Sequence, residues 1–150
     1  MVDLDETLYR ETVQHFLLLY RYLRQYGRQM HKEGISGRKV STLRYLAESG
    51  PLTVGQLSAY LCISDSSTSV MLAKLEKDGY VTRTRSSTDN RVVLVDLTSV
   101  GQQIVQNTAL GGIPLLREAL RTLPQERLDV VHEAMATLVD TLEIGEGSRP

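Results

Sequence analysis

The chain has 150 residues, 41% of them hydrophobic and 23% charged, and its formal net charge is −1. This length and composition predict a soluble globular protein with one domain, or with one domain and an interaction arm. Because the longest apolar runs are four or five residues and the N-terminus is acidic, we expect neither a membrane-spanning segment nor a secretory signal. The single cysteine fits a reducing compartment, and we expect the protein to be cytoplasmic.

The charges are unevenly distributed along the chain. Residues 36–91 carry eight basic and five acidic groups, whereas residues 92–150 carry four basic and eight acidic groups. A basic excess confined to one segment is what a contact with DNA phosphates requires. The excess is small, and ordinary scatter could also produce it.

The first predicted element is a long helix over residues 4–32, which contains no proline. Apolar residues spaced three and four apart form a stripe along it, together with its only glycine: Val13, Phe16, Tyr20, Leu23, Gly27 and Met30. Further leucines and tyrosines widen this stripe beyond one face. A helix that is apolar on most sides must be covered on most sides, so the pattern predicts a partner beyond the core of one small chain.

Three shorter helices follow, over residues 38–49, from Thr53 to about Leu61, and over residues 65–78. Thr53 begins a capping-box pattern, and Ser64 is the expected N-cap of the third of these helices. The residues expected to face inward in the first two are Val40, Leu43, Leu46, Ala47, Val54, Leu57 and Leu61. Two helices joined by about three residues form a helix–turn–helix.

The segment that follows Gly79 predicts a β-hairpin. Residues 80–85 alternate bulky or β-branched residues with polar ones, and residues 92–95 are four aliphatic residues in a row. Residues 86–90, between them, are a cluster of turn formers. A helix–turn–helix that leads into a basic hairpin predicts a winged helix-turn-helix, and therefore a DNA-binding protein.

The rest of the chain is predicted to be helical. Thr98 is the expected N-cap of the first helix, and Pro114 breaks or kinks the chain because it lacks an N–H and clashes with a carbonyl of the preceding turn. Two more helices are expected over residues 115–123 and 124–142. The apolar positions of the last one are spaced like the a/d seam of a coiled coil: Leu128, Val131, Met135, Leu138 and Leu142.

Two motifs lie at the hairpin and just before it. The pattern Asp-x-Arg, three residues, a β-branched residue, then x-Leu-Thr-x-x-Gly is matched by Asp89, Arg91, Val95, Leu97, Thr98 and Gly101. The pattern Leu-x-x-x-Gly-x-Val-x-Arg is matched by Leu75, Gly79, Val81 and Arg83. In these motifs and in their spacing, the chain resembles the MarR family of bacterial and archaeal transcriptional regulators. The strong match covers residues 51–101, and the flanking helices agree in number, length and order.

The resemblance implies a mainly α fold with a small β-hairpin wing, in a single domain of residues 1–150. It implies a winged helix-turn-helix DNA-binding region at residues 36–99. It also implies a helical dimerisation arm formed by the N- and C-terminal helices, residues 4–34 and 100–143. The partners implied are a second copy of the chain, as a homodimer, and a pseudo-palindromic operator in double-stranded DNA.

The helix over residues 65–78 is the expected recognition helix in the major groove. Its inward stripe consists of Thr68, Met71, Leu72 and Leu75. The residues left outward, which we expect to contact DNA, are Ser66, Ser67, Ser69, Val70, Ala73, Lys74 and Lys77. Because the outward set contains no Arg, Asn or Gln, the common bidentate reading of guanine or adenine is missing, which weakens the expected base specificity.

The hairpin, over residues 83–92, is the expected wing. By the resemblance, Arg91 at its tip enters the minor groove, where it senses groove width and negative potential. Asp89 is interpreted as orienting a nearby arginine, either Arg91 or Arg83, and Arg83 and Arg85 are expected to add phosphate contacts. The alternative for Asp89 and Arg91 is a surface ion pair of almost no energetic value.

The resemblance also implies an effector, because many family members release DNA when a small aromatic or anionic compound enters a crevice between the arm and the winged helix. The candidate lining residues are Tyr20, Arg24, His31 and Tyr45. The alternative is that the tyrosines belong to the core, with their hydroxyls at its edge. The predicted function is therefore a homodimeric repressor that a small-molecule effector releases from DNA.

Other functions remain as alternatives. A redox-sensing regulator would act through Cys62, but the family's sensing cysteines lie by the first helix, where this chain has none. We interpret Cys62 as a small buried residue that packs in the turn. A winged-helix protein–protein interaction module would not need Arg91. The three histidines lack ligand-like spacing and no nucleophile–base arrangement stands out, so we expect no metal, no cofactor and no enzymatic activity.

Overall fold

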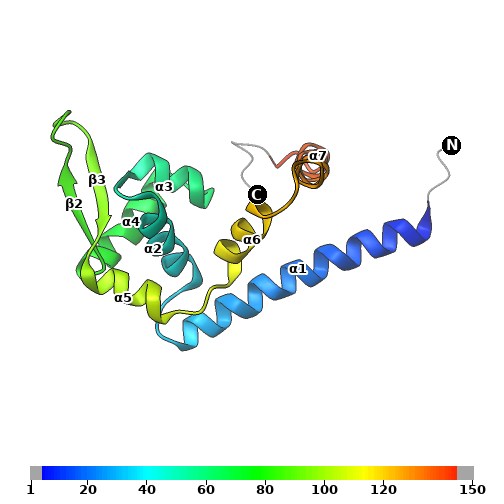
Figure 1. Ribbon diagram of the computed structural model, residues 1–150, viewed down its shortest axis with the longest axis horizontal. Helices are drawn as coiled ribbons and strands as arrows, with labels where there is room; N and C mark the ends of the chain where they lie inside the picture. Colours follow the sequence, from blue (N-terminus) through cyan, green and yellow to red (C-terminus); the bar gives the residue numbers. More distant parts are fainter. Residues whose placement is uncertain (1–4, 145–150) are drawn as a thin grey trace. The chain divides into compact units, whose positions relative to one another are not determined.

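The computed structural model describes residues 5–144, which form two compact units divided at residues 114 and 115. The elements in chain order are α1 (Glu6–Lys32), α2 (Gly37–Ser49), β1 (Leu52–Thr53), α3 (Val54–Leu61), α4 (Asp65–Lys77), β2 (Val81–Arg85), β3 (Val93–Leu97), α5 (Ser99–Asn107), α6 (Gly112–Arg121) and α7 (Gln125–Thr141) (Figure 1). The predicted fold class, mainly α with a small β-hairpin wing, is confirmed. None of the helices within residues 5–144 is both long and apolar enough to cross a membrane.

The long N-terminal helix is confirmed as α1. Asp5 caps it, because its carboxylate accepts hydrogen bonds of 3.0 Å from the backbone N–H groups of Thr7 and Leu8. Residue 4, where the helix was expected to begin, lies outside the described residues. Met30 is the one residue of α1 that is buried, and Val13, Phe16 and Tyr20 of the predicted stripe are exposed.

The hydrophobic core of the first unit lies in the winged helix. Its most deeply buried side chains include Val40, Leu43, Leu46, Leu57, Leu72, Leu75, Val81 and Val95. Val54 and Leu61 are half-buried, whereas Ala47, which we expected to face inward, is exposed. Ser41 and Thr42 are also buried, so the buried face of α2 is rotated toward them and Ala47 lies outside it.

The helix–turn–helix is formed by α3 and α4. Thr53 and Gln56 make the predicted capping box, with reciprocal hydrogen bonds of 3.1 and 2.9 Å. Between the two helices, Ser58 donates a buried hydrogen bond of 2.9 Å to Thr68. A buried hydroxyl pair of this kind fixes how the helices cross, because losing either partner leaves a buried polar group unsatisfied.

The hairpin β2–β3 is confirmed, and a third strand joins it. The sheet order is β1-β3-β2, with both pairs antiparallel and Leu52 opposite Val95. Figure 1 shows the hairpin projecting from the short helices of the first unit. β1 was not predicted, because a strand of two residues is too short to show an alternating pattern.

The Thr-x-x-Gly part of the family motif joins the hairpin to α5. Thr98 donates a hydrogen bond of 2.6 Å from its hydroxyl to the carbonyl of Gly79, and the same hydroxyl accepts one of 3.1 Å from the N–H of Gly101. The backbone N–H of Thr98 donates to the carbonyl of Tyr80 at 3.1 Å. A β-carbon at Gly101 would overlap that carbonyl, so the close approach requires glycine.

The second unit contains most of α6 and the whole of α7. A break is present but lies earlier than predicted: α5 ends at Asn107 and α6 begins at Gly112. Pro114 therefore does not break the chain but lies in the first turn of α6, where its missing N–H removes no helical hydrogen bond. Pro124 directly precedes α7, as expected. None of the residues of α7 is buried, and among its exposed apolar side chains are Val130, Met135, Leu138 and Val139.

Candidate DNA-binding surface and an adjoining crevice

The recognition helix α4 has one buried face and one open face. Thr68, Leu72 and Leu75 are fully buried. Of the outward set, Ser66, Ser67, Val70, Ala73, Lys74 and Lys77 are exposed. Val70 is 60% exposed, and an exposed valine on a helix that packs well elsewhere is available for apolar contact with a partner. Ser69 differs from the rest of the set because it is half-buried.

The hydroxyl groups at the start of α4 form a local network. Ser64 accepts a hydrogen bond of 3.2 Å from the N–H of Ser67, and its hydroxyl lies 3.0 Å from the hydroxyls of both Ser66 and Ser67. All three residues are exposed. Exposed hydroxyls can exchange these hydrogen bonds for contacts with phosphates or base edges at small cost.

The tip of the wing is ordered by short-range hydrogen bonds. The carboxylate of Asp89 accepts a hydrogen bond of 2.9 Å from the backbone N–H of Arg91. Arg85 donates one of 2.7 Å to the carbonyl of Asn90. The expectation that Asp89 orients an arginine side chain is therefore wrong, because an aspartate in a tight turn reaches the backbone two residues on. The Arg91 side chain is exposed at the tip.

Arg83 lies on the inner side of the hairpin. Its guanidinium forms an ion pair of 3.3 Å with Glu76 and donates to the carbonyl of Ser69 at 3.4 Å. Alternation along β2 puts Arg83 on the same face as the buried Val81. Arg83 therefore joins the wing to α4, and its carboxylate partner is Glu76 instead of Asp89.

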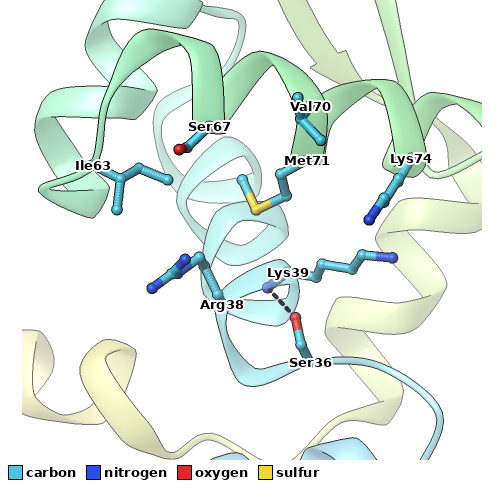
Figure 2. Close-up of a pocket in the computed structure, with 8 residues that line it drawn as sticks. All are labelled: Ser36, Arg38, Lys39, Ile63, Ser67, Val70, Met71 and Lys74. Carbon is cyan, nitrogen blue, oxygen red and sulfur yellow. Dashed lines mark hydrogen bonds between the residues drawn. The ribbon is translucent and has the colours of Figure 1, made fainter.

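A groove of about 410 Å³ runs between the start of α2 and the exposed face of α4 (Figure 2). Its lining residues are Ser36, Arg38, Lys39, Ile63, Ser67, Val70, Met71 and Lys74. The ammonium of Lys39 lies 3.3 Å from the carboxylate of Asp78. In Figure 2, Arg38 and Lys39 extend to opposite sides, and Lys39 points to the side of Lys74. The sequence reading missed Arg38 and Lys39 as site residues, although both lie in the basic segment 36–91.

A crevice of about 430 Å³ lies on another side of α2. Its lining comes from α1, α2, the end of α3 and the start of α6: Leu23, Gly37, Arg38, Ser41, Tyr60, Leu61, Cys62, Gly112 and Ile113. The hydroxyls of Ser41 and Tyr60 are 2.9 Å apart. The ring of Tyr60 stacks on that of Tyr45, with centroids 3.9 Å apart. The hydrogen bond and the ring stacking together fix the position of Tyr60 in the wall of the crevice.

The four candidate ligand residues are not brought together. The guanidinium of Arg24 lies over the ring of Tyr20 at 5.6 Å from its centroid, on an exposed part of α1. His31 is exposed near the end of α1, and Tyr45 stacks against Tyr60. None of the four is among the described residues that line the crevice. A crevice does lie beside α1, but residues other than the four candidates line it.

The linker between α5 and α6 is held against α1 and α2. Tyr26 donates a hydrogen bond of 3.2 Å to the carbonyl of Ala109, and the hydroxyl of Tyr22 accepts one of 2.9 Å from the N–H of Gly112. Burial raises the pKa of Tyr26. Gly112 has a φ of +62°, and a β-carbon there would lie 2.6 Å from the Tyr26 ring. Both features require glycine at this edge of the crevice.

Cys62 is exposed, so the expectation that it is buried is wrong. It is the C-cap of α3 and has a φ of +52°, a left-handed conformation in which its thiol lies 3.7 Å from the carbonyl of Ala59. The neighbouring Ile63 is half-buried instead. Among residues 5–144, no group of three or more His, Cys, Asp or Glu side chains is placed to hold a metal ion.

Comparison with known proteins gives the following relatives. The model of the MarR family matches residues 35–93. The organic hydroperoxide resistance transcriptional regulator of Bacillus subtilis (strain 168) is 30% identical over 119 residues, covering 79% of this chain and 80% of that protein. The crystal structure of AbsC, a MarR family transcriptional regulator from Streptomyces coelicolor, is similar at a TM-score of 0.66 and 20% identity, covering 97% of this chain and 98% of that one. A mutant of MepR from S. aureus bound to an oligodeoxyribonucleotide is similar at a TM-score of 0.53 and 16% identity, covering 88% and 97% of the two chains.

Proposed function

The chain belongs to the MarR family and is a DNA-binding transcriptional regulator, and on that premise we propose that it is a homodimeric repressor released by a small-molecule effector. Its operator is a pseudo-palindromic site in double-stranded DNA, as the two-fold symmetry of a dimer requires. Residues 36–99 bind this DNA, and residues 4–34 and 100–143 form the dimer. It works in the cytoplasm and catalyses no reaction.

One observation carries the DNA-binding part of the proposal. The recognition helix α4 keeps Val70, Lys74 and two serines open to solvent. Thr68, Leu72 and Leu75, on its opposite face, are fully buried. Arg83 connects this helix to the wing through Glu76, so the wing and α4 would approach DNA as one body. The MepR mutant, which shares this fold, is bound to an oligodeoxyribonucleotide, which supports DNA binding by the fold.

In this proposal, the exposed residues of α4 enter the major groove and Arg91 enters the minor groove. The exposed α4 residues are Ser66, Ser67, Val70, Ala73, Lys74 and Lys77. Ser69, Arg83, Arg85 and Asp89 instead hold the surface in shape, because each is engaged in contacts within the protein.

The homodimer is supported by the apolar side chains that the chain leaves uncovered. On α1 these include Leu8, Phe16 and Leu17, each more than half exposed. On α7 they include Val130, Met135 and Leu138. Exposed apolar surface on this scale marks an interface, and a second copy of the same helices supplies the same kind of surface.

The proposed effector site is the crevice beside α2. Its volume of about 430 Å³ lies within the usual range for small-molecule pockets. Apolar walls with a few fixed polar groups are typical of such sites, and here Ser41 and Tyr60 supply polar groups that already contact each other. The four residues first expected to line it then lie outside this site: Tyr20, Arg24, His31 and Tyr45.

A salt-titrated gel shift tests the proposal, with the DNA upstream of the protein's own gene compared with scrambled DNA. We expect the upstream DNA to bind about a thousand-fold more tightly, or better, at physiological salt. Equal affinity for both DNAs would refute an operator-specific regulator. Absence of binding to either would favour the protein–protein interaction module.

A further inference from the structure

Two tyrosines of α1 hold the linker between α5 and α6. The hydroxyl of Tyr26 donates a hydrogen bond of 3.2 Å to the carbonyl of Ala109, and the hydroxyl of Tyr22 accepts one of 2.9 Å from the N–H of Gly112. We propose that Tyr22 and Tyr26 are positioning residues that fix the angle between α1 and the winged helix, and that this angle sets the operator half-site spacing that the dimer accepts. This inference rests on the proposed function, because half-site spacing concerns only a homodimer on a two-fold operator.

Tyr26 lies where the winged helix is joined to the rest of the chain. Because α5 packs against the core of the winged helix, the joining segments are residues 33–36 before α2 and residues 108–111 after α5. Figure 1 shows the second segment passing the last turns of α1 (Figure 1). A β-carbon at Gly37, directly after the first segment, would lie 3.8 Å from the Tyr26 ring. The Tyr26 side chain therefore contacts the chain at both junctions.

The ring of Tyr26 fits closely against two glycines of the linker. A β-carbon at Gly111 would overlap the ring, and one at Gly112 would lie 2.6 Å from it. Both glycines are buried. Because the linker can approach so closely only without side chains, the ring has little room to shift. Gly112 has a positive φ and Gly111 does not, so a substitution at Gly111 tests the packing alone.

The beginning of the linker is held by the winged helix instead of by α1. Arg44 of α2 donates a hydrogen bond from its guanidinium to the carbonyl of Thr108. The hydroxyl of Thr108 donates one of 2.6 Å to the carbonyl of Ile104 in α5. The next residue is Ala109, whose carbonyl accepts from Tyr26 of α1. Consecutive linker residues are thus bound to the winged helix and to α1, so the linker connects the two directly.

The contact at Tyr22 resists rotation of α1 more than burial at the end of the helix does. Met30 is the one buried residue of α1, and a single buried side chain fixes a point but not a direction. Tyr22 lies about two turns before Met30, which is about 12 Å along a helix. A hydrogen bond at that distance from the buried point holds the direction of the helix.

A small change of this angle is sufficient to alter the half-site spacing. α2 has 13 residues and is therefore about 20 Å long. A rotation of about 10° at its start moves its far end by about 3.5 Å, close to the rise of one base pair. Both subunits of a dimer would rotate, so the two recognition helices would shift by more than one base pair. A joint that prevents this rotation makes the dimer select one spacing.

The first test measures the spacing of the winged helices in the DNA-free dimer. Cys62 is the only cysteine and is exposed in the turn before α4, so a spin label on it gives one label per subunit. We expect Gly111→Ala to shift or broaden the distribution of label-to-label distances, because the new β-carbon displaces the ring of Tyr26. Gly27→Ala is the matched control, since no described atom lies within 4 Å of its new β-carbon. It should keep the wild-type distribution.

The second test measures affinity for operators whose half-sites have the natural spacing, or one base pair more or fewer. Wild type and Gly27→Ala should bind the natural spacing at least about ten-fold more tightly than either altered one. In Gly111→Ala this preference should fall to about three-fold or less, while the slope of log affinity against log salt stays unchanged, because the phosphate contacts are the same.

Tyr22→Phe tests the same joint without changing the packing of the linker. It removes only the acceptor of the Gly112 N–H, and Tyr22 is 36% exposed, so we expect the variant to fold. Tyr20→Phe is its control, because the hydroxyl of Tyr20 makes no hydrogen bond within residues 5–144. Tyr22→Phe should broaden the label distances and weaken the spacing preference, less than Gly111→Ala does, and Tyr20→Phe should do neither. Thermal melts and sedimentation verify that each variant is a folded dimer.

Two results would overturn the inference. One is a folded, dimeric Gly111→Ala with the label distances and the spacing preference of the wild type. The other is a Tyr22→Phe that does not differ from Tyr20→Phe in either measurement, and this comparison decides alone if Gly111→Ala does not fold. A wild type that is monomeric, or that does not bind the operator, refutes the proposed function instead, so the two failures are distinguishable.

Discussion

Leucine side chains are buried in the winged helix but exposed on the two terminal helices, α1 and α7. Leu57, Leu72 and Leu75 in the winged helix are fully buried, whereas Leu8 on α1 is 61% exposed and Leu138 on α7 is 42% exposed. Burying one leucine contributes about 1.5–3 kcal/mol. The winged helix therefore buries its leucines within one chain, and in the proposed homodimer a second copy covers those of α1 and α7.

Replacing Leu138 with arginine should have the largest effect on stability. It tests whether a second copy of the chain covers α7. In a dimer the change places an unpaired charge in an apolar seam, which costs about 3–5 kcal/mol. Because Leu138 is 42% exposed in the single chain, the winged helix itself should remain folded. Sedimentation should show dissociation. A wild type that sediments as a well-folded monomer at micromolar concentration would refute the dimer altogether.

Replacing Gly101 with alanine tests whether contacts within one chain stabilise the winged helix. The new β-carbon meets the carbonyl of Tyr80, so we expect a loss of about 1–3 kcal/mol in the free energy of unfolding. Gly55→Ala is the matched control, because the nearest atom to its new β-carbon lies 3.9 Å away. In α3 this control should be neutral or stabilising by about 1 kcal/mol or less. Chemical denaturation followed by circular dichroism measures both. Equal stability of the two variants would contradict the role given to Gly101.

Local signals in the sequence were sufficient to predict most of the fold. The capping box at Thr53 and the N-caps Ser64 and Thr98 each depend only on residues three positions away. β1 was missed because its pairing with β3 joins segments about 40 residues apart, and pairing across such a distance leaves no mark in two residues.

The site was harder to predict, because its contacts depend on which faces meet in three dimensions. Alternation along β2 could have shown that Arg83 faces inward, as Val81 does, but only the fold reveals Glu76 as its partner. The outward face of α4 was predictable from helical period alone. The groove at Arg38 was not, since it arises where α2 passes α4.

Replacing Arg91 with alanine should have a smaller effect, confined to DNA binding. Arg91 is exposed at the wing tip, so its loss should leave folding and the dimer unchanged. The salt slope should fall by about one unit, with weaker binding to all sequences. Val70→Ala should instead change the preferred sequence more than the slope, because valine offers only an apolar contact. An Arg91→Ala protein with unchanged affinity and slope would remove the wing from the mechanism.

Replacing Cys62 with serine should have the smallest effect. Cys62 is the only cysteine in the chain, so it cannot form a disulfide within one subunit. Its thiol lies 3.7 Å from the carbonyl of Ala59, a contact within the turn. We therefore expect wild type and Cys62→Ser to bind operator DNA equally, before and after mild peroxide. The similarity to an organic hydroperoxide resistance regulator and the exposure of the thiol make the opposite result worth measuring. Reversible loss of binding in the wild type, absent in Cys62→Ser, would mean that this turn senses oxidants.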